Sequence, residues 1–392
     1  MTKFIFGLLG FVAAIGCSIE ATRAITPDKA EFKKLADGVY AYVGKRNDAN
    51  AMVVVTSQGV VVVDTGNNQP ESRNLMRSIQ SVTAQPVRYV VITQNHGDHI
   101  GGTSLFSPPA HVIVHDKVAK VLAAMKPYQI RSWRKRFSER AEALRDVNPI
   151  DTVISFPDRM TLNLGGKVIE LIYVDDVYNI GDVAVWLPQD GILHASFAGY
   201  KERHPDLRPD YSHGTTWGMV KQLEALIALQ PRIVVPAHGP LGDVTDLTAM
   251  EDYLLLARQK VRAMMDQGMP LAEIEKKFDM REYQGWDRDE HLSWTADTIY
   301  RELRGEGPQK SSTAEKTVKG AIVKASEEGR RLTLALEGGK ELRLRITSET
   351  DIEGVADRTQ LKDGQKVTAL YAEPQDGSAP LGYDVLELIV EP

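Results

Sequence analysis

Residues 88–102 read RYVVITQNHGDHIGG, and this stretch decides the fold of the chain. The run 89–93 is short, apolar and β-branched, which is typical of a strand covered on both faces. His96, Asp98 and His99 follow at once, before two glycines open a turn. A loop lets neighbouring side chains point at one place, whereas successive side chains of a strand alternate. Because imidazole and carboxylate are ligands for zinc and iron, the stretch predicts a metal site, with a polar loop of structural histidines as the alternative.

The same stretch resembles the signature of the metallo-β-lactamase superfamily, which is a strand, then Thr-His-x-His-x-Asp-His, then Gly-Gly. The matching residues are Thr93, His96, Asp98, His99, Gly101 and Gly102. Gln94 stands where the signature has its first histidine. The resemblance implies an α/β (α+β) fold, an αββα sandwich whose loops converge at one edge. It also implies metal-assisted hydrolysis as the activity.

Two further motifs extend the resemblance along the chain. Asp64, Thr65 and Gly66 follow a predicted hairpin and are similar to the family's Asp-x-Gly. This implies that Asp64 supports the metal ligands through hydrogen bonds. Residues 233–240, IVVPAHGP, are similar to the family's last motif, a strand followed by a ligand histidine, which is here His238.

Three ligand positions of the family are held by other residues in this chain. One is Gln94, and the second is Tyr178, which replaces a histidine shortly before a matching Gly-Asp pair. Phe197, or Tyr200 if the alignment slips by three residues, replaces a carboxylate that bridges two metals. In the family the positions of Gln94, Tyr178 and His96 hold the first metal, so His96 is the one ligand of that site that remains. Amide and phenol are poor zinc ligands beside imidazole, so the resemblance implies that the first of two metal sites is lost.

One metal site remains in this comparison. Its ligands are Asp98, His99 and His238, which would hold one zinc ion, or iron or manganese, less tightly than a complete site does. Three hypotheses stay open: a hydrolase with His96 as general base beside Asp98, a metal-free binding protein that keeps the cleft, and a mononuclear iron oxidoreductase. Each implies a small-molecule substrate or ligand that the sequence does not name, and a β-lactam is not specifically indicated.

Composition argues against a nucleic-acid partner. The net charge is −6, from 47 Lys and Arg against 53 Asp and Glu, and this gives no electrostatic case for binding nucleic acid. The 392 residues allow two or three domains.

Residues 1–24 have the shape of a secretory signal, because Lys3 precedes an apolar run that is too short for a stable membrane span, and small residues follow. Cleavage near Ala24 would release a free protein. The sequence AIGC, which ends at Cys17, instead resembles a lipobox and would place a lipid anchor on that residue. Cys17 is the only cysteine, so no intrachain disulfide can form. The chain is therefore predicted to be exported, either periplasmic or lipid-anchored to a membrane.

The predicted organisation is a signal peptide (1–24), a metallo-β-lactamase-like domain (25–304), a linker (305–316) and a small β-barrel of OB or SH3-like type (317–392). The linker is rich in Gly, Ser, Pro and Lys and has no apolar periodicity. Short alternating segments predict the barrel: 317–325, 331–337, 341–347, 366–373 and 381–390. The predicted barrel has no aromatic platform and no basic stripe, which again disfavours nucleic acid.

Periodicity predicts the remaining elements of the main domain. An edge strand is expected at about residue 39, hairpins at 51–64 and 158–174, a strand at 111–115, and helices at 70–83, 213–229, 243–267 and 271–278. Residues 117–147 predict a helical insert rich in Arg and Lys, which is interpreted either as a solvated face or as a rim for an anionic substrate.

Overall fold

A computed structural model gives the fold of the chain. The residues that it describes are 29–45, 48–67, 69–124, 153–174, 181–207, 215–306, 313–326, 329, 331–346, 350–356, 358–374 and 383–391. Tyr178, most of the predicted basic insert and residues 1–28 lie outside them. No helix among the described residues is long and apolar enough to cross a membrane.

The first sheet has seven strands that follow one another in chain order. Its strands are β1 (Glu31–Ala36), β2 (Val39–Val43), β3 (Ala51–Thr56), β4 (Gly59–Val63), β5 (Val87–Val91), β6 (His111–His115) and β7 (Val153–Phe156). Neighbours from β1 to β4 pair antiparallel, and those from β4 to β7 pair parallel. The change of direction follows from the connections, because helix α1 (Gln69–Val82) carries the chain from β4 back to β5.

The second sheet has five strands in the order β12-β11-β10-β9-β8. They are β8 (Arg159–Leu164), β9 (Lys167–Tyr173), β10 (Val183–Leu187), β11 (Ile192–His194) and β12 (Ile233–Val235). The first four pair antiparallel and β12 adds parallel to β11. The two sheets meet at their ends, where the Val183 N–H donates to the Thr93 carbonyl at 2.9 Å.

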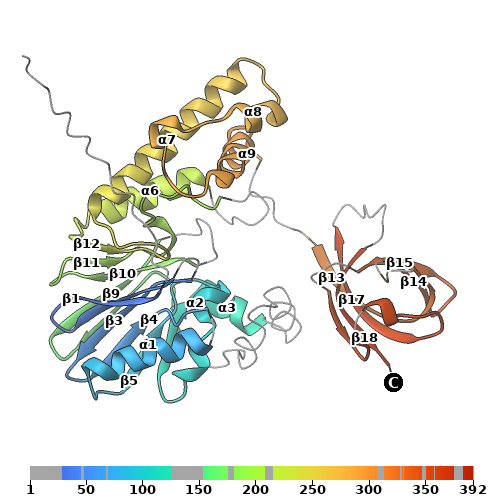
Figure 1. The fold of residues 1–392 in the computed structure, drawn as a ribbon, viewed down its shortest axis with the longest axis horizontal. Helices are drawn as coiled ribbons and strands as arrows, with labels where there is room; N and C mark the ends of the chain where they lie inside the picture. The colour runs from blue at the N-terminus through green and yellow to red at the C-terminus, as the bar shows by residue number, and fades with distance from the viewer. Residues whose placement is uncertain are drawn as a thin grey trace, which may run out of the picture.

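Helices cover both outer faces, so the predicted αββα sandwich is confirmed (Figure 1). Leu75 and Ile79 of α1, with Val118 and Leu122 of α3 (Asp116–Ala124), pack on the first sheet. The second sheet is covered by α6 (Thr216–Ile227), α7 (Val244–Asp266), α8 (Leu271–Lys277) and α9 (Leu292–Leu303). A third core of almost entirely valine, leucine and isoleucine side chains fills the space between the sheets.

Several predicted boundaries shift for physical reasons. The run predicted as a strand at 89–93 is β5, which ends at Val91, because the Thr93 N–H bonds the Asp64 side chain at 2.8 Å instead of a neighbouring strand. The prediction of one N-terminal edge strand was incomplete. β1 and β2 form a hairpin whose turn needs Gly38 at φ 70°.

Two predicted helices are described with their N-caps. The Thr215 side chain accepts from the Gly218 N–H at the start of α6, and Asp243 forms a capping box at the start of α7. The predicted insert at 117–147 is described only as far as Ala124, where α3 ends.

The C-terminal strands form a sheet of their own, drawn in red in Figure 1. They are β13 (Thr313–Ala325), β14 (Arg331–Leu336), β15 (Glu341–Arg345), β16 (Asp351–Glu353), β17 (Lys366–Pro374) and β18 (Tyr383–Val390). A pairing of β15 with β18 joins β13, β14, β15, β18 and β17 into a ring of hydrogen-bonded neighbours, as a small barrel requires. Strand β16 was not predicted, because it has only three residues. The domain boundary at 305–316 stays a prediction, and β13 begins inside it.

The described residues also include several short helices. They are α2 (Gly97–Ile100), η1 (Thr103–Leu105), η3 (Ser196–Ala198), η4 (Arg281–Tyr283), η5 (Asp289–His291) and η6 (Arg358–Gln360).

Candidate metal centre

Three predicted ligands from distant parts of the chain come together at one edge of the sandwich. Asp98 and His99 lie in α2, directly after β5, and His238 follows β12. The His238 Nε2 atom lies 3.1 Å from Asp98 Oδ2, and His99 Nε2 lies 3.8 Å from the same oxygen. Within the described residues these three form the group that could hold a metal ion, with ligand atoms all within 4.8 Å of one another.

Both imidazoles are held so that Nε2 faces the centre of this group. His99 Nδ1 lies 2.6 Å from Asp64 Oδ2, and His238 Nδ1 donates to the Asp48 carbonyl oxygen at 3.2 Å. Each Nδ1 therefore carries its proton toward a fixed acceptor, which leaves the Nε2 lone pair for a metal. The two rings meet edge to face at 83°, so their Nε2 atoms approach from different directions.

Asp64 ties the centre to the first sheet. It is fully buried, with φ 61°, and it accepts hydrogen bonds from the Thr93 N–H at 2.8 Å and the Thr93 hydroxyl at 2.7 Å in addition to His99. One carboxylate thus fixes the exit of β5 and the orientation of a candidate ligand. Asp64 thus contacts a candidate ligand, as the resemblance implied, and its role toward a metal stays a prediction.

The charges of the centre act strongly on its members. Burial raises the pKa of Asp98, but the positive charges of His99 and His238 outweigh it and hold the pKa well below its usual range. Burial lowers the pKa of His99, but the charges of Asp64 and Asp98 outweigh this and raise the pKa to about 9. Without a metal, His99 therefore carries two protons at neutral pH, and a metal must displace one of them.

Gln94 lies against His99, with its amide nitrogen 2.7 Å from His99 Nε2 and 1% of its surface exposed. Two N–H donors cannot bond to each other. While His99 is protonated, the amide oxygen must therefore face the imidazole, which is a reversal of the two ends of the amide. The residue that replaces a family histidine thus contacts a member of the remaining group.

His96 lies half-buried directly before α2, and its charge contributes to the low pKa of Asp98. Its ring is not one of the three ligand groups whose atoms converge. The role of general base predicted for it stays a prediction.

Phe197 and Tyr200, the two alternatives for the bridging position, form an apolar wall beside the centre. Both are buried, and their rings meet edge to face at 5.1 Å. The Tyr200 ring stacks on His238 with centroids 6.3 Å apart. Burial raises the pKa of the Tyr200 phenol, so it stays neutral. Neither residue supplies an anion to shield a second metal ion.

Sequence reasoning missed three residues around the centre. Asn50 holds the turn that carries His238, because its side-chain amide donates to the carbonyl oxygens of Pro236 and Gly239 at 2.9 Å each. The Asp48 carbonyl orients His238. Because every residue has a backbone carbonyl, the sequence does not show which one takes this role.

The third missed residue is His194, at the end of β11. It is fully buried, and its Nε2 has no hydrogen-bond partner in the described part of the chain and lies 3.8 Å from Asp64 Oδ2. Burial lowers its pKa to about 4. Its place in an apolar run was the only available signal, and that pattern is equally typical of a packing histidine.

Comparison with known proteins identifies the same family as the sequence motifs. The sequence model of the metallo-beta-lactamase superfamily matches residues 44–238. The alpha subunit of 2,4-dinitroanisole O-demethylase from Nocardioides sp. (strain JS1661) is 23% identical over 225 residues, covering 57% of this chain and 60% of the relative. The linear primary-alkylsulfatase of Pseudomonas sp. (strain ATCC 19151) is 22% identical over 250 residues, covering 55% and 46%.

A solved structure shares the fold. The stereoselective inverting sec-alkylsulfatase Pisa1 from Pseudomonas sp. superposes with a TM-score of 0.56 at 13% identity, covering 71% of this chain and 51% of that chain. The chain thus spans less than two thirds of the length of these relatives.

Proposed function

Since the chain belongs to the metallo-β-lactamase superfamily, we propose that it is a hydrolase that uses one metal ion held by Asp98, His99 and His238. One observation carries the proposal. Two imidazole Nε2 atoms converge on one carboxylate oxygen, while groups outside the cluster fix both rings from behind. A structural cluster would not need both rings oriented in this way, whereas a metal site does.

The donor set suits zinc. Two imidazole nitrogens and one carboxylate oxygen leave a position open on a four-coordinate ion, as catalytic zinc sites require. A bound ion would act as a Lewis acid and activate water for attack on the substrate. The same donors also suit iron, so the metal is to be identified by analysis of the purified protein.

The residues of the chain divide the remaining work. Asp64 and the Asp48 carbonyl keep the rings oriented, and Tyr200 and Phe197 exclude water from one side of the centre. His96, half-buried directly before α2, is the residue that we propose to accept a proton from the attacking water. The names of two relatives, an alkylsulfatase and an O-demethylase subunit, direct the search for a substrate to small organic esters and ethers.

Zinc titration against a chromophoric chelator tests the proposal. We expect one ion per chain in the unmutated protein and no measurable binding in His99→Ala. His111→Ala is the matched control, because His111 is an exposed histidine at the start of β6. Turnover is then assayed on alkyl sulfates and aryl methyl ethers.

Each result has a clear consequence. Two tightly bound zinc ions would restore a conventional dinuclear hydrolase. No uptake of zinc, iron or manganese at millimolar concentration would favour the metal-free binding protein instead. Uptake of iron alone, with turnover that consumes oxygen, would favour the oxidoreductase.

A further inference from the structure

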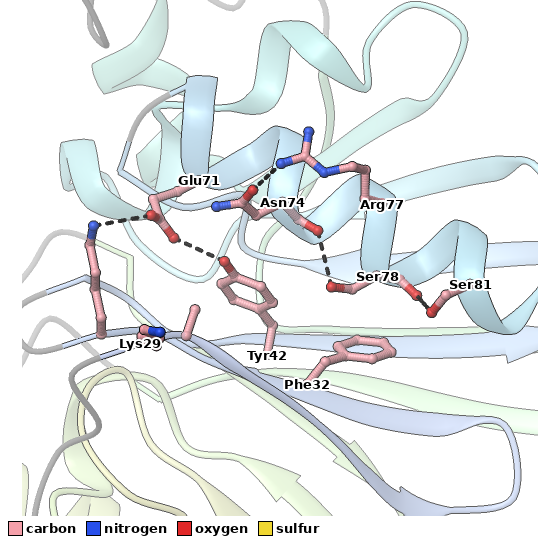
Figure 2. Close-up of a pocket in the computed structure, with 10 residues that line it drawn as sticks. Lys29, Phe32, Tyr42, Glu71, Asn74, Arg77, Ser78 and Ser81 are labelled. Atoms are coloured by element: carbon pink, nitrogen blue, oxygen red, sulfur yellow. Dashed lines mark hydrogen bonds and ion pairs between the residues drawn. The ribbon is translucent and has the colours of Figure 1, made fainter.

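A groove lies on the outer face of the first sheet, and none of the candidate metal ligands lines it. It encloses about 570 Å³ between α1 and the strands β1 and β2 (Figure 2). This volume lies in the range of sites for small molecules. We propose that the groove binds a small organic anion with an apolar body, such as an alkyl or aryl sulfonate or carboxylate.

The floor of the groove is built from buried polar groups. The Tyr42 hydroxyl donates to Glu71 Oε2 at 2.9 Å, and both side chains are less than one tenth exposed. Burial, together with the charge of Glu71, raises the pKa of Tyr42, so the phenol remains neutral. Lys45 lies 3.5 Å from the other oxygen of Glu71 and compensates its charge. The one carboxylate among the described residues that line the groove is therefore already satisfied.

The remaining charge of the groove is positive. Lys29 and Arg77 line it from opposite sides, and within the described part of the chain neither has a carboxylate partner. Among the residues that the structure describes, the Arg77 guanidinium bonds only the side-chain oxygen of Asn74, one turn away on α1. Three cations, Lys29, Lys45 and Arg77, thus face one carboxylate among the described lining residues, so the net charge of the groove is positive and favours an anionic ligand.

The strand side of the groove is apolar. The Phe32 ring stacks on Tyr40 with centroids 5.1 Å apart and an interplanar angle of 5°, so it is held as a flat surface. Figure 2 shows the rings of Phe32 and Tyr42 facing the polar side chains of α1 across the groove. A ligand that matches both sides has an anionic head near Lys29 and Arg77 and an apolar part against the two rings.

Calorimetric titration of the full chain with octanesulfonate tests the proposal, because its carbon–sulfur bond is not a substrate for a hydrolase of esters or ethers. We expect one site per chain. Arg77→Gln should weaken binding at least about tenfold, since a charge-assisted hydrogen bond is lost. Arg73→Gln is the matched control, because Arg73 is exposed on the same helix but does not line the groove, and it should leave the affinity unchanged. Octanol and methanesulfonate, which carry only the tail or only the head, should bind more weakly than octanesulfonate.

Two further variants separate this site from the metal centre. Tyr42→Phe keeps the ring and removes the hydroxyl that holds Glu71, so it should also weaken binding. His99→Ala should leave binding unchanged, whatever its effect on metal uptake. Equal affinity of Arg77→Gln and Arg73→Gln, octanol binding as tight as octanesulfonate, or loss of binding in His99→Ala would each overturn the proposal.

Discussion

Replacing Asp64 by asparagine tests how the centre controls its own metal affinity. The change is nearly isosteric, and asparagine tolerates the left-handed backbone at this position, where φ is 61°. In the unmutated protein the Asp64 carboxylate bonds His99 Nδ1 at 2.6 Å, and its negative charge raises the pKa of that imidazole. Asp64→Asn removes this charge. It therefore changes two quantities at once, the proton that a metal must displace and the orientation of the ring.

At neutral pH the two changes act on the apparent metal affinity in opposite directions. In the unmutated protein His99 has a pKa of about 9, so apparent metal affinity should rise about tenfold per pH unit between pH 7 and 9. Without the Asp64 charge the pKa of His99 falls, and this slope should largely disappear. Loss of the supporting carboxylate should also reduce the affinity about 10- to 100-fold when no proton competes. We expect the two proteins to bind zinc about equally at pH 7 and to differ by about 10- to 100-fold at pH 9.

Competition with a chelator of known affinity measures the zinc affinity of both proteins at pH 7, 8 and 9. Circular dichroism shows whether each variant is folded. Asp37→Asn is the control, because Asp37 is a fully exposed carboxylate in the turn between β1 and β2. A flat pH profile for the unmutated protein would refute the reasoning, and so would an unchanged slope in Asp64→Asn.

Three further predictions follow from other parts of the structure. The folded pKa of His194, about 4, lies below its unfolded value of 6.5, so its contribution to stability is complete above pH 6.5 and is lost as pH falls toward 4. That contribution amounts to about 3 kcal/mol. In His194→Gln the free energy of unfolding, measured by chemical denaturation, should therefore fall less between pH 7 and pH 4. Gly102→Ala should cost at least about 2 kcal/mol, because a Cβ there would lie 1.6 Å from Ser72 Oγ and 2.5 Å from the Thr65 carbonyl. Gly218→Ala, inside α6 with only Thr215 Oγ1 nearby at 3.2 Å, is its near-neutral control in the same denaturation assay. Mass spectrometry of the mature protein should find an N-terminus near Ile25 or an acylated Cys17, and an intact Met1 would contradict the proposed export.

The layers of the fold could be predicted because they follow from periodicity. An uninterrupted valine run such as β4 is typical of a strand buried on both faces, and α1 shows one apolar side with Leu75 and Ile79. Strand β16 and the separation of β1 from β2 could not be predicted. A three-residue strand has no period, and the break at Gly38 depends on a turn rather than on a pattern.

The candidate ligands and the supporting Asp64 could be named from motifs, but the other groups that hold the ligands could not. Asp98, His99 and His238 each belong to a short motif with a fixed order along the chain. The other groups that hold them are the carbonyl of Asp48, which orients His238, and the side chain of Asn50, which fixes the turn that carries His238. Tertiary structure alone brings these groups to the site, so a single sequence carries no signal for them.

Gln94 shows why the motif and the structure lead to different views of one residue. In the sequence it marks a missing histidine and hence a lost ligand. In the structure its amide lies 2.7 Å from the His99 nitrogen that would bind a metal, in a position with almost no exposure to solvent. While that nitrogen is protonated, the reversed amide presents its oxygen, which accepts a hydrogen bond from the His99 N–H and stabilises the metal-free form. The substitution therefore does more than remove a ligand, because it gives the protonated His99 a partner and adds to the free energy that metal binding must overcome.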